Sequence, residues 1–261
     1  MKSETIRLPN NRCWQIYSGG SGPTLMWLHG VHNVDPDDPF LGALQNQYRV
    51  VAPVAPGFND LNELSEIDNI HDLVLDYDDL IEGLGLDRIS LVGHSFGAMI
   101  AAEVAAHFPH RISRLVLIAP FGLWNDAYPV ADIFSYPSAQ IDDILWQDRT
   151  ARSLFTKPLE DEADLATAAD QMIKVAQSLT AVTKFVWPIP GNGLRKRLRR
   201  IACPTLAVFG LRDKVVNSRY ADDFNCALRY ATTAVVPDAG HMLPYEKSEQ
   251  VQQLIDAFLQ Q

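Results

Sequence analysis

The stretch Gly93-His94-Ser95-Phe96-Gly97 decides the fold of this chain, because it places a serine between two strongly patterned segments. Residues 88–92 form a short apolar run typical of a buried strand, and residues 98–106 form an alanine-rich run typical of a helix. Glycines two positions before and after the serine remove side chains that would clash at a sharp strand-to-helix turn. We therefore expect the Ser95 hydroxyl to stand clear of the sheet, beside a helix N-terminus that favours negative charge on a substrate oxygen.

The surrounding sequence alternates short β-rich runs with amphipathic helices, which is typical of βαβ units in a mostly parallel sheet. A helix is predicted over residues 70–84, where apolar side chains recur at spacings of three and four and form one stripe. A second amphipathic helix is predicted at the C-terminal end, over residues 251–259. The predicted strands are residues 13–17, 24–28, 48–52, 89–92, 115–118, 205–209 and 233–236.

The rhythm changes after Pro120. Residues 123–198 contain several prolines and no convincing buried strand, and residues 161–179 are predicted to form a helix rich in Ala, Asp and Gln. We therefore expect an α/β fold with a doubly wound, mostly parallel sheet built from residues 1–122 and 199–261. Residues 123–198 would be a helical insertion that acts as a cap.

Composition limits the functional classes. A chain of 261 residues with 47% hydrophobic residues can bury one large core, and a net charge of −10 argues against a nucleic-acid partner. The first residues lack the apolar segment of a signal peptide, and no window approaches the roughly 18 apolar residues of a membrane span. Cys13, Cys203 and Cys226 are widely spaced and are interpreted as reduced thiols. The expectation is a cytoplasmic protein without a membrane partner.

A serine hydroxyl is a weak nucleophile, so it needs a base within hydrogen-bond reach and a third group that orients the base. His241 lies in a loop between a predicted strand and the last helix, and Asp213 lies directly beyond the strand that follows the insertion. Both residues, like Ser95, follow the carboxyl ends of strands, where open parallel sheets gather their functional loops. We predict that Ser95, Asp213 and His241 form a catalytic triad.

The chain order Ser95, Asp213, His241 is the α/β-hydrolase order of nucleophile, acid and base. With Gly93–Gly97, the strand-end Gly210-Leu-Arg-Asp213, the Ala239-Gly-His241 loop and Leu28-His-Gly30, the sequence resembles the α/β-hydrolase superfamily over nearly its whole length. It looks closest to the capped subgroup of meta-cleavage-product hydrolases, small carboxylesterases and cofactor-free perhydrolases.

The resemblance implies an oxyanion hole made by the backbone N–H groups of Phe96 and Val31. Where many relatives have glycines after the His-Gly pair, this chain has Val31-His32-Asn33, so His32 or Asn33 would also present a side chain to the pocket. The implied chemistry is two-step acyl transfer, which needs no metal and no organic cofactor.

Several residues carry alternative interpretations. Asp126 is a rival acid, although an Asx-turn or cap accounts for it more simply. His29 and His32 share an H-x-x-H spacing but have no third ligand, so no metal site is predicted, and His94 is interpreted as packing support. The basic run 195–200 is interpreted as a solvated helix face, with the alternative that one arginine binds a substrate carboxylate.

The insertion is rich in aromatic residues, of which part should pack on the core and part should line an apolar substrate pocket. The substrate-binding candidates are His32, Trp124, Trp187 and Met242. The predicted function is a serine hydrolase that cleaves a small to medium carboxylic ester with an apolar acyl or aryl group. The alternatives are carbon–carbon bond hydrolysis of the meta-cleavage type, a perhydrolase, and a non-catalytic ligand receptor on the same fold.

Overall fold

The computed structural model describes residues 1–155, 164–189 and 192–261. Its centre is an eight-stranded sheet in the order β1-β2-β4-β3-β5-β6-β7-β8. β2 pairs antiparallel with both β1 and β4, whereas every pairing from β4 through β3 to β8 is parallel. The strands are β1 (Lys2–Arg7), β2 (Cys13–Gly19), β3 (Thr24–Leu28), β4 (Arg49–Pro53), β5 (Ile89–His94), β6 (Ile112–Ile118), β7 (Thr205–Gly210) and β8 (Ala231–Val236).

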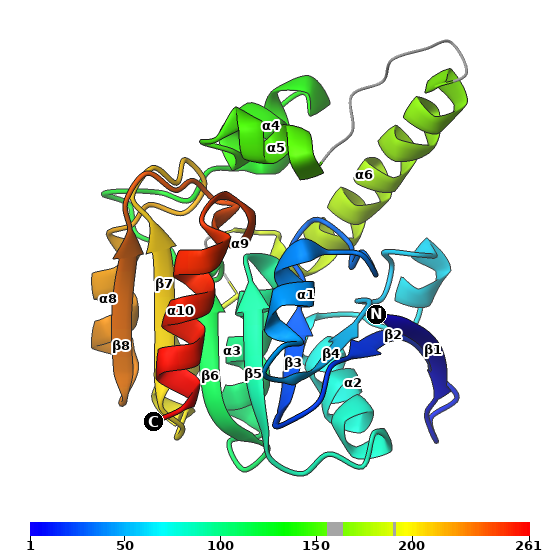
Figure 1. The fold of residues 1–261 in the computed structure, drawn as a ribbon, viewed down its shortest axis with the longest axis vertical. Helices are drawn as coiled ribbons and strands as arrows, with labels where there is room; N and C mark the ends of the chain where they lie inside the picture. The colour runs from blue at the N-terminus through cyan, green and yellow to red at the C-terminus, as the bar shows by residue number, and fades with distance from the viewer. Residues whose placement is uncertain (156–163, 190–191) are drawn as a thin grey trace.

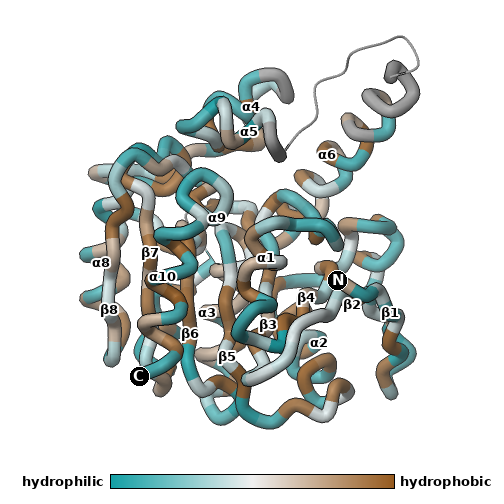
Figure 2. The backbone as a smooth tube through the Cα atoms, in the orientation of Figure 1, coloured by the Kyte–Doolittle hydropathy of each residue, from teal (hydrophilic) through white to brown (hydrophobic). Residues whose placement is uncertain are grey.

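Helices cover both faces of this sheet, as expected for a doubly wound fold (Figure 1). α1 (Pro39–Leu44) and α10 (Ser248–Leu259) lie against one face, and α2 (Ile70–Gly83) and α3 (Phe96–His107) contact each other on the other. Figure 2 shows that the central strands between these layers consist largely of hydrophobic residues. The remaining elements of the core are η1 (Leu61–Leu64), α8 (Tyr220–Ala227) and α9 (Leu243–Glu246).

The sequence patterns located seven of these strands to within a few residues, but β1 was not predicted. Almost all side chains of β1 are exposed, and the strand pairs only with β2 at the edge of the sheet. An edge strand with little buried surface carries no clear hydrophobic alternation, which is the signal on which the prediction relied.

Between β6 and β7 the described residues form helices and turns without a strand, as the sequence indicated. They are η2 (Ile133–Ser135), α4 (Ser138–Leu145), α5 (Arg149–Phe155), α6 (Asp164–Val186), α7 (Leu194–Arg197) and η3 (Leu198–Arg200). The helix predicted over 161–179 corresponds to α6, which continues to Val186; residues 161–163 lie outside the described residues. In Figure 1, α4, α5 and the upper part of α6 stand beyond the end of the sheet at which the parallel strands finish.

The end of this segment belongs to the core by its packing. α7 and η3 contact α3, and the side chains of Leu194 and Leu198 are fully buried. The division of the chain into a core and a separate cap domain of residues 123–198 therefore stays a prediction. Among the described residues, no helix combines the length and the apolar character that a bilayer span requires.

Candidate active site

Ser95 occupies a strained turn between β5 and α3, as the glycine pattern predicted. Its backbone has φ 56° and ψ −116°, a conformation that non-glycine residues rarely adopt. A Cβ at Gly93 would collide with the carbonyl oxygen of Gly97, and a Cβ at Gly97 would collide with the carbonyl oxygen of Leu28. The two glycines are thus needed because backbone segments approach one another closely around Ser95.

The structure brings Ser95, His241 and Asp213 together in one chain of hydrogen bonds. The Nε2 atom of His241 lies 2.7 Å from the Ser95 Oγ, and its Nδ1 lies 2.9 Å from Asp213 Oδ2. A carboxylate can only accept, so Nδ1 carries the ring proton and Nε2 is left to accept the hydroxyl proton of the serine. All three residues are buried, although they come from loops after β5, β7 and β8.

Asp213 is itself held in place by the backbone. Its Oδ1 accepts hydrogen bonds from the N–H groups of Val215 at 2.7 Å and Val216 at 2.9 Å. One carboxylate oxygen is therefore fixed on the turn after β7, while the other faces the imidazole. The rival acid Asp126 is exposed and accepts a hydrogen bond from the indole Nε1 of Trp124. The carboxylate that contacts His241 is that of Asp213.

The loop that carries His241 is bonded to the insertion. The backbone N–H groups of His241 and Met242 both donate to the carbonyl oxygen of Leu145, at the end of α4. The carboxylate of Glu246 accepts from the N–H groups of Gly240 at 2.9 Å, and of Gln147 and Asp148 at 3.3 Å. Burial raises the pKa of Glu246.

Sequence reasoning did not single out Glu246. The spacing of this acidic residue from His241 carries no recognisable signal, since its role depends on backbone groups of the distant segment 147–148.

The two predicted oxyanion donors are the backbone N–H groups of Phe96 and Val31, which belong to two different segments near Ser95. Phe96 is the first residue of α3, so its N–H is one of those that no intrahelical carbonyl can accept. Val31 follows Gly30, whose Cβ, if present, would lie 3.1 Å from the Cβ of Ser95. Within the described ranges, neither N–H donates to another residue of the chain. That both donate to a substrate oxygen stays a prediction.

His29 and His32 shape the loop that bears Val31. The His29 Nε2 accepts from the Ala55 N–H at 3.0 Å, so Nδ1 carries the proton and donates to the Gly30 carbonyl at 2.9 Å. Burial lowers the pKa of His29 to about 4. Burial likewise lowers the pKa of His32 to about 4, an effect that Asp142 opposes and His241 reinforces. No cluster of three or more His, Cys, Asp or Glu side chains that could hold a metal ion is found in the described part of the chain.

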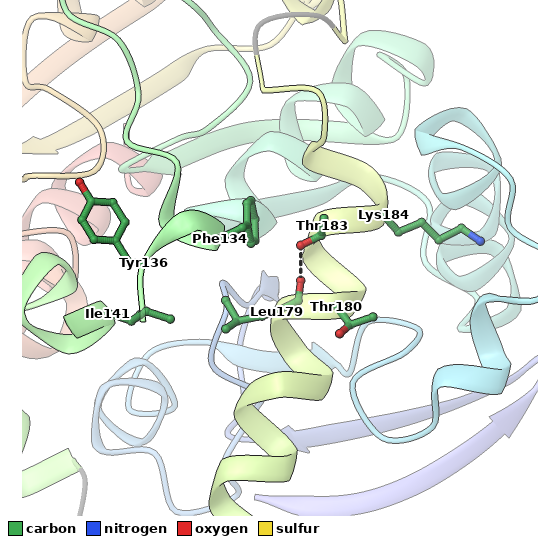
Figure 3. A pocket seen from close by; sticks show the side chains of 7 residues that line it. All are labelled: Phe134, Tyr136, Ile141, Leu179, Thr180, Thr183 and Lys184. Atoms are coloured by element: carbon green, nitrogen blue, oxygen red, sulfur yellow. Dashed lines mark hydrogen bonds between the residues drawn. The ribbon is translucent and has the colours of Figure 1, made fainter. Parts of the chain in front are cut away.

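A cavity of about 500 Å³ lies between the start of the insertion and α6 (Figure 3). The hydroxyl groups of Thr180 and Thr183 donate to backbone carbonyls of their own helix, and the Lys184 ammonium donates to the carbonyl oxygen of Leu64. Figure 3 shows the Lys184 side chain extending away from the aromatic side of the cavity. The lining residues are Phe134, Tyr136, Ile141, Leu179, Thr180, Thr183 and Lys184.

Two ring contacts and one charge interaction relate this cavity to the serine. Phe185, the residue after Lys184, stacks on Phe96 with ring centroids 6.2 Å apart. Phe96 stacks in turn on Phe58, with centroids 6.4 Å apart. On the α4 side, Asp142 follows the lining residue Ile141 and interacts electrostatically with His32. Residues adjacent in sequence to the lining residues thus interact with Phe96, which follows Ser95, and His32, which follows Val31.

The predicted substrate-binding residues have different surroundings. Met242 is buried beside His241, and His32 lies within electrostatic range of His241. Trp124 bonds to the exposed Asp126, and Trp187 is 56% exposed after the end of α6. Neither tryptophan is among the residues that line the cavity.

Three arginines of the basic run 195–200 are bonded to neighbouring elements. Arg195 pairs with Asp223, Arg197 makes a bidentate pair with the fully buried Glu103, and Arg200 donates to the carbonyl oxygen of Ala106. These arginines anchor α7 and η3 to α3 and α8. The alternative that one of them binds a substrate carboxylate finds no support in these contacts.

Comparison with known proteins agrees with the fold. One curated relative is the 2-hydroxy-6-oxo-2,4-heptadienoate hydrolase of Pseudomonas putida, 25% identical over 92% of this chain and 86% of that protein. Another is the dihydrolipoyllysine-residue acetyltransferase component of the acetoin cleaving system of Cupriavidus necator, 25% identical over 92% of this chain. The match covers only 64% of that longer protein.

Among solved structures, the naproxen esterase of Bacillus subtilis superposes with a TM-score of 0.76 at 16% identity, over 99% of this chain and 91% of that one. This likeness shows a shared fold. Residues 18–257 match the model of the alpha/beta hydrolase family, so the chain belongs to that family.

Proposed function

We propose that this protein is a serine hydrolase that cleaves small to medium carboxylic esters through an acyl-enzyme. The observation that carries the proposal is the hydrogen-bonded series Ser95 Oγ, His241 and Asp213, with distances of 2.7 Å and 2.9 Å. In this arrangement the serine has a base in reach and the base has a fixed tautomer, which are the conditions that activate a hydroxyl nucleophile.

The reaction would proceed in two steps, acylation of Ser95 and hydrolysis of the acyl-enzyme. Ser95 Oγ attacks the ester carbonyl while its proton passes to His241 Nε2, and Asp213 stabilises the resulting imidazolium. The N–H groups of Phe96 and Val31 stabilise the oxyanion, each contributing about 3 kcal/mol. The imidazolium then protonates the leaving alcohol. A water molecule, deprotonated by His241, attacks the acyl group, and the carboxylic acid and free Ser95 are released.

The cavity favours an apolar acyl or aryl group. The aromatic and aliphatic side chains of Phe134, Ile141 and Leu179 line it, and its threonine hydroxyls are bonded within α6. A substrate would therefore meet mainly carbon atoms, which favours apolar over charged groups.

Carbon–carbon bond hydrolysis is the second candidate, because the Pseudomonas putida relative carries the name of a dienoate hydrolase. A dienoate substrate brings a carboxylate that needs a cationic or polar partner. Arg195, Arg197 and Arg200 are bonded to other groups of the chain, and the Lys184 ammonium is bonded to a backbone carbonyl. These commitments favour the neutral ester.

The deciding experiment measures turnover of p-nitrophenyl esters from acetate to dodecanoate, and of one meta-cleavage dienoate, by the native chain and by Ser95→Ala. Ester turnover that disappears in Ser95→Ala supports the proposal. Turnover of the dienoate alone would favour the carbon–carbon hydrolase. A fluorophosphonate probe serves as a second readout: it should label the native chain and Ser65→Ala, in which only an exposed serine is changed, but not Ser95→Ala. Absence of both turnover and labelling would favour a ligand receptor.

A further inference from the structure

His94 is a buried histidine that the proposed mechanism leaves unused. It is the last residue of β5, directly before Ser95, and its side chain is almost completely buried. Its Nε2 atom lies 2.8 Å from the backbone carbonyl oxygen of His241. Because a carbonyl oxygen can only accept, Nε2 must carry the proton and donate it. The residue thus joins the nucleophile strand to the loop of the base.

The imidazole of His94 stays neutral in this position. Burial lowers its pKa to about 3, and the neighbouring His241, His32 and His29 lower it further than the carbonyl of His241 raises it. The donor is therefore present at every pH at which a histidine base can work. His94 is not a rival base, since its Nε2–H points at a carbonyl and its ring centroid lies 5.4 Å from that of His241.

Two further contacts define what this hydrogen bond holds. On the other edge of the ring, a Cβ at Gly30 would lie 3.1 Å from the His94 Nδ1, so the ring also abuts the loop that leads to Val31. The backbone N–H of His241 donates to the carbonyl of Leu145 in the insertion. The backbone of His241 is thus held from the core side by His94 and from the insertion side by Leu145.

We propose that His94 is a positioning residue: its Nε2–H fixes the backbone of His241 so that the imidazole of the base meets the Ser95 hydroxyl. This inference rests on the proposed triad and adds to it a residue that touches neither substrate nor reacting atoms. The physical reason is geometric, because a displacement of about 1 Å at a reacting centre can cost about 10²-fold in rate.

The test compares His94→Gln with His94→Asn, two neutral amides of different reach. The amide nitrogen of glutamine can occupy the place of Nε2 and donate to the His241 carbonyl, whereas that of asparagine reaches only the place of Nδ1. We expect His94→Asn to lower kcat by about 10- to 100-fold with KM changed less than about twofold, and His94→Gln to stay within about threefold of the native kcat. His110→Leu, a change of an exposed histidine, is the control.

Equal kcat losses in His94→Gln and His94→Asn would overturn the proposal, as would native kcat in a folded His94→Asn. Crystal structures of both variants give a readout that does not depend on catalysis. The His241 imidazole should shift in His94→Asn and keep its place in His94→Gln, and an unmoved ring in both would also overturn it. Ser95→Ala is assayed in parallel: if it kept turnover, the proposed function would fail, while the position of His241 would still decide the role of His94.

Discussion

The carboxyl edge of the sheet and the helical insertion above it are built in different ways. At the sheet edge, Ser95, Asp213 and His241 have exposed fractions of 3%, 9% and 1%, and each is hydrogen-bonded to the next. In the insertion, α6 leaves Met172 and Ile173 exposed at 68% and 62%. The difference indicates that the proposed reacting groups are held in a buried, hydrogen-bonded setting, whereas α6 exposes apolar side chains to solvent.

The two regions meet at the loop that carries His241, the proposed base. Leu145 accepts hydrogen bonds from the His241 and Met242 backbone, and Glu246 bonds to both Gly240 and the segment 147–148. Changes in the core should therefore alter turnover of every substrate. Changes in the insertion should discriminate between substrates, except where they disturb this junction.

The largest effect is expected for Asp213→Asn, which should lower turnover about 10⁴-fold for all esters alike. An amide in place of the carboxylate no longer stabilises the protonated imidazole and favours the wrong tautomer. Asp126→Asn, a change of the exposed aspartate that bonds to Trp124, is the matched control and should retain native turnover. Steady-state kinetics on the ester series checks both, and a reversed result would transfer the acid role to Asp126.

A smaller effect should appear in the acid stability of the core. The folded state lowers the pKa of His94 from 6.5 to about 3, so this residue contributes stability that is present above pH 6.5 and lost as the pH falls below it. Between pH 8 and pH 5 the native chain should lose about 2 kcal/mol more unfolding free energy than His94→Gln. Urea unfolding at the two pH values measures this difference. Equal losses in the two proteins would show that folding does not lower the pKa of His94.

In the insertion, Leu179→Trp should separate substrates by size. Leu179 lines the cavity, so a larger side chain there should lower kcat/KM for p-nitrophenyl decanoate by about tenfold and leave the acetate within about twofold. Thr183→Val is the control, because the hydroxyl of Thr183 is already bonded to the carbonyl of Leu179. The ratio of the two kcat/KM values is the measurement. An equal loss on both esters would mean that the cavity is not the acyl site.

The smallest effect is expected for Trp187→Ala. Its side chain is 56% exposed and does not line the cavity, so kcat/KM for every ester should stay within about twofold of the native value. The same p-nitrophenyl series provides the measurement. A loss confined to long acyl chains would instead place Trp187 at the substrate.

The sequence by itself determined the parts of this protein that depend on local physics. The glycines around Ser95 follow from close backbone approach at one turn, and buried strands such as β5 and β7 follow from short apolar runs. Asp213 and His241 could be chosen because they directly follow strands, and parallel strands end at one edge of a sheet.

Only the tertiary structure decided what depends on groups far apart in the chain. His94 reaches a carbonyl 147 positions away, and Glu246 holds backbone groups nearly 100 positions away. Arg197 pairs with the buried Glu103, which no local pattern indicates. These roles arise because a hydrogen bond is set by the position and direction of both partners, and only the packed fold supplies the second one.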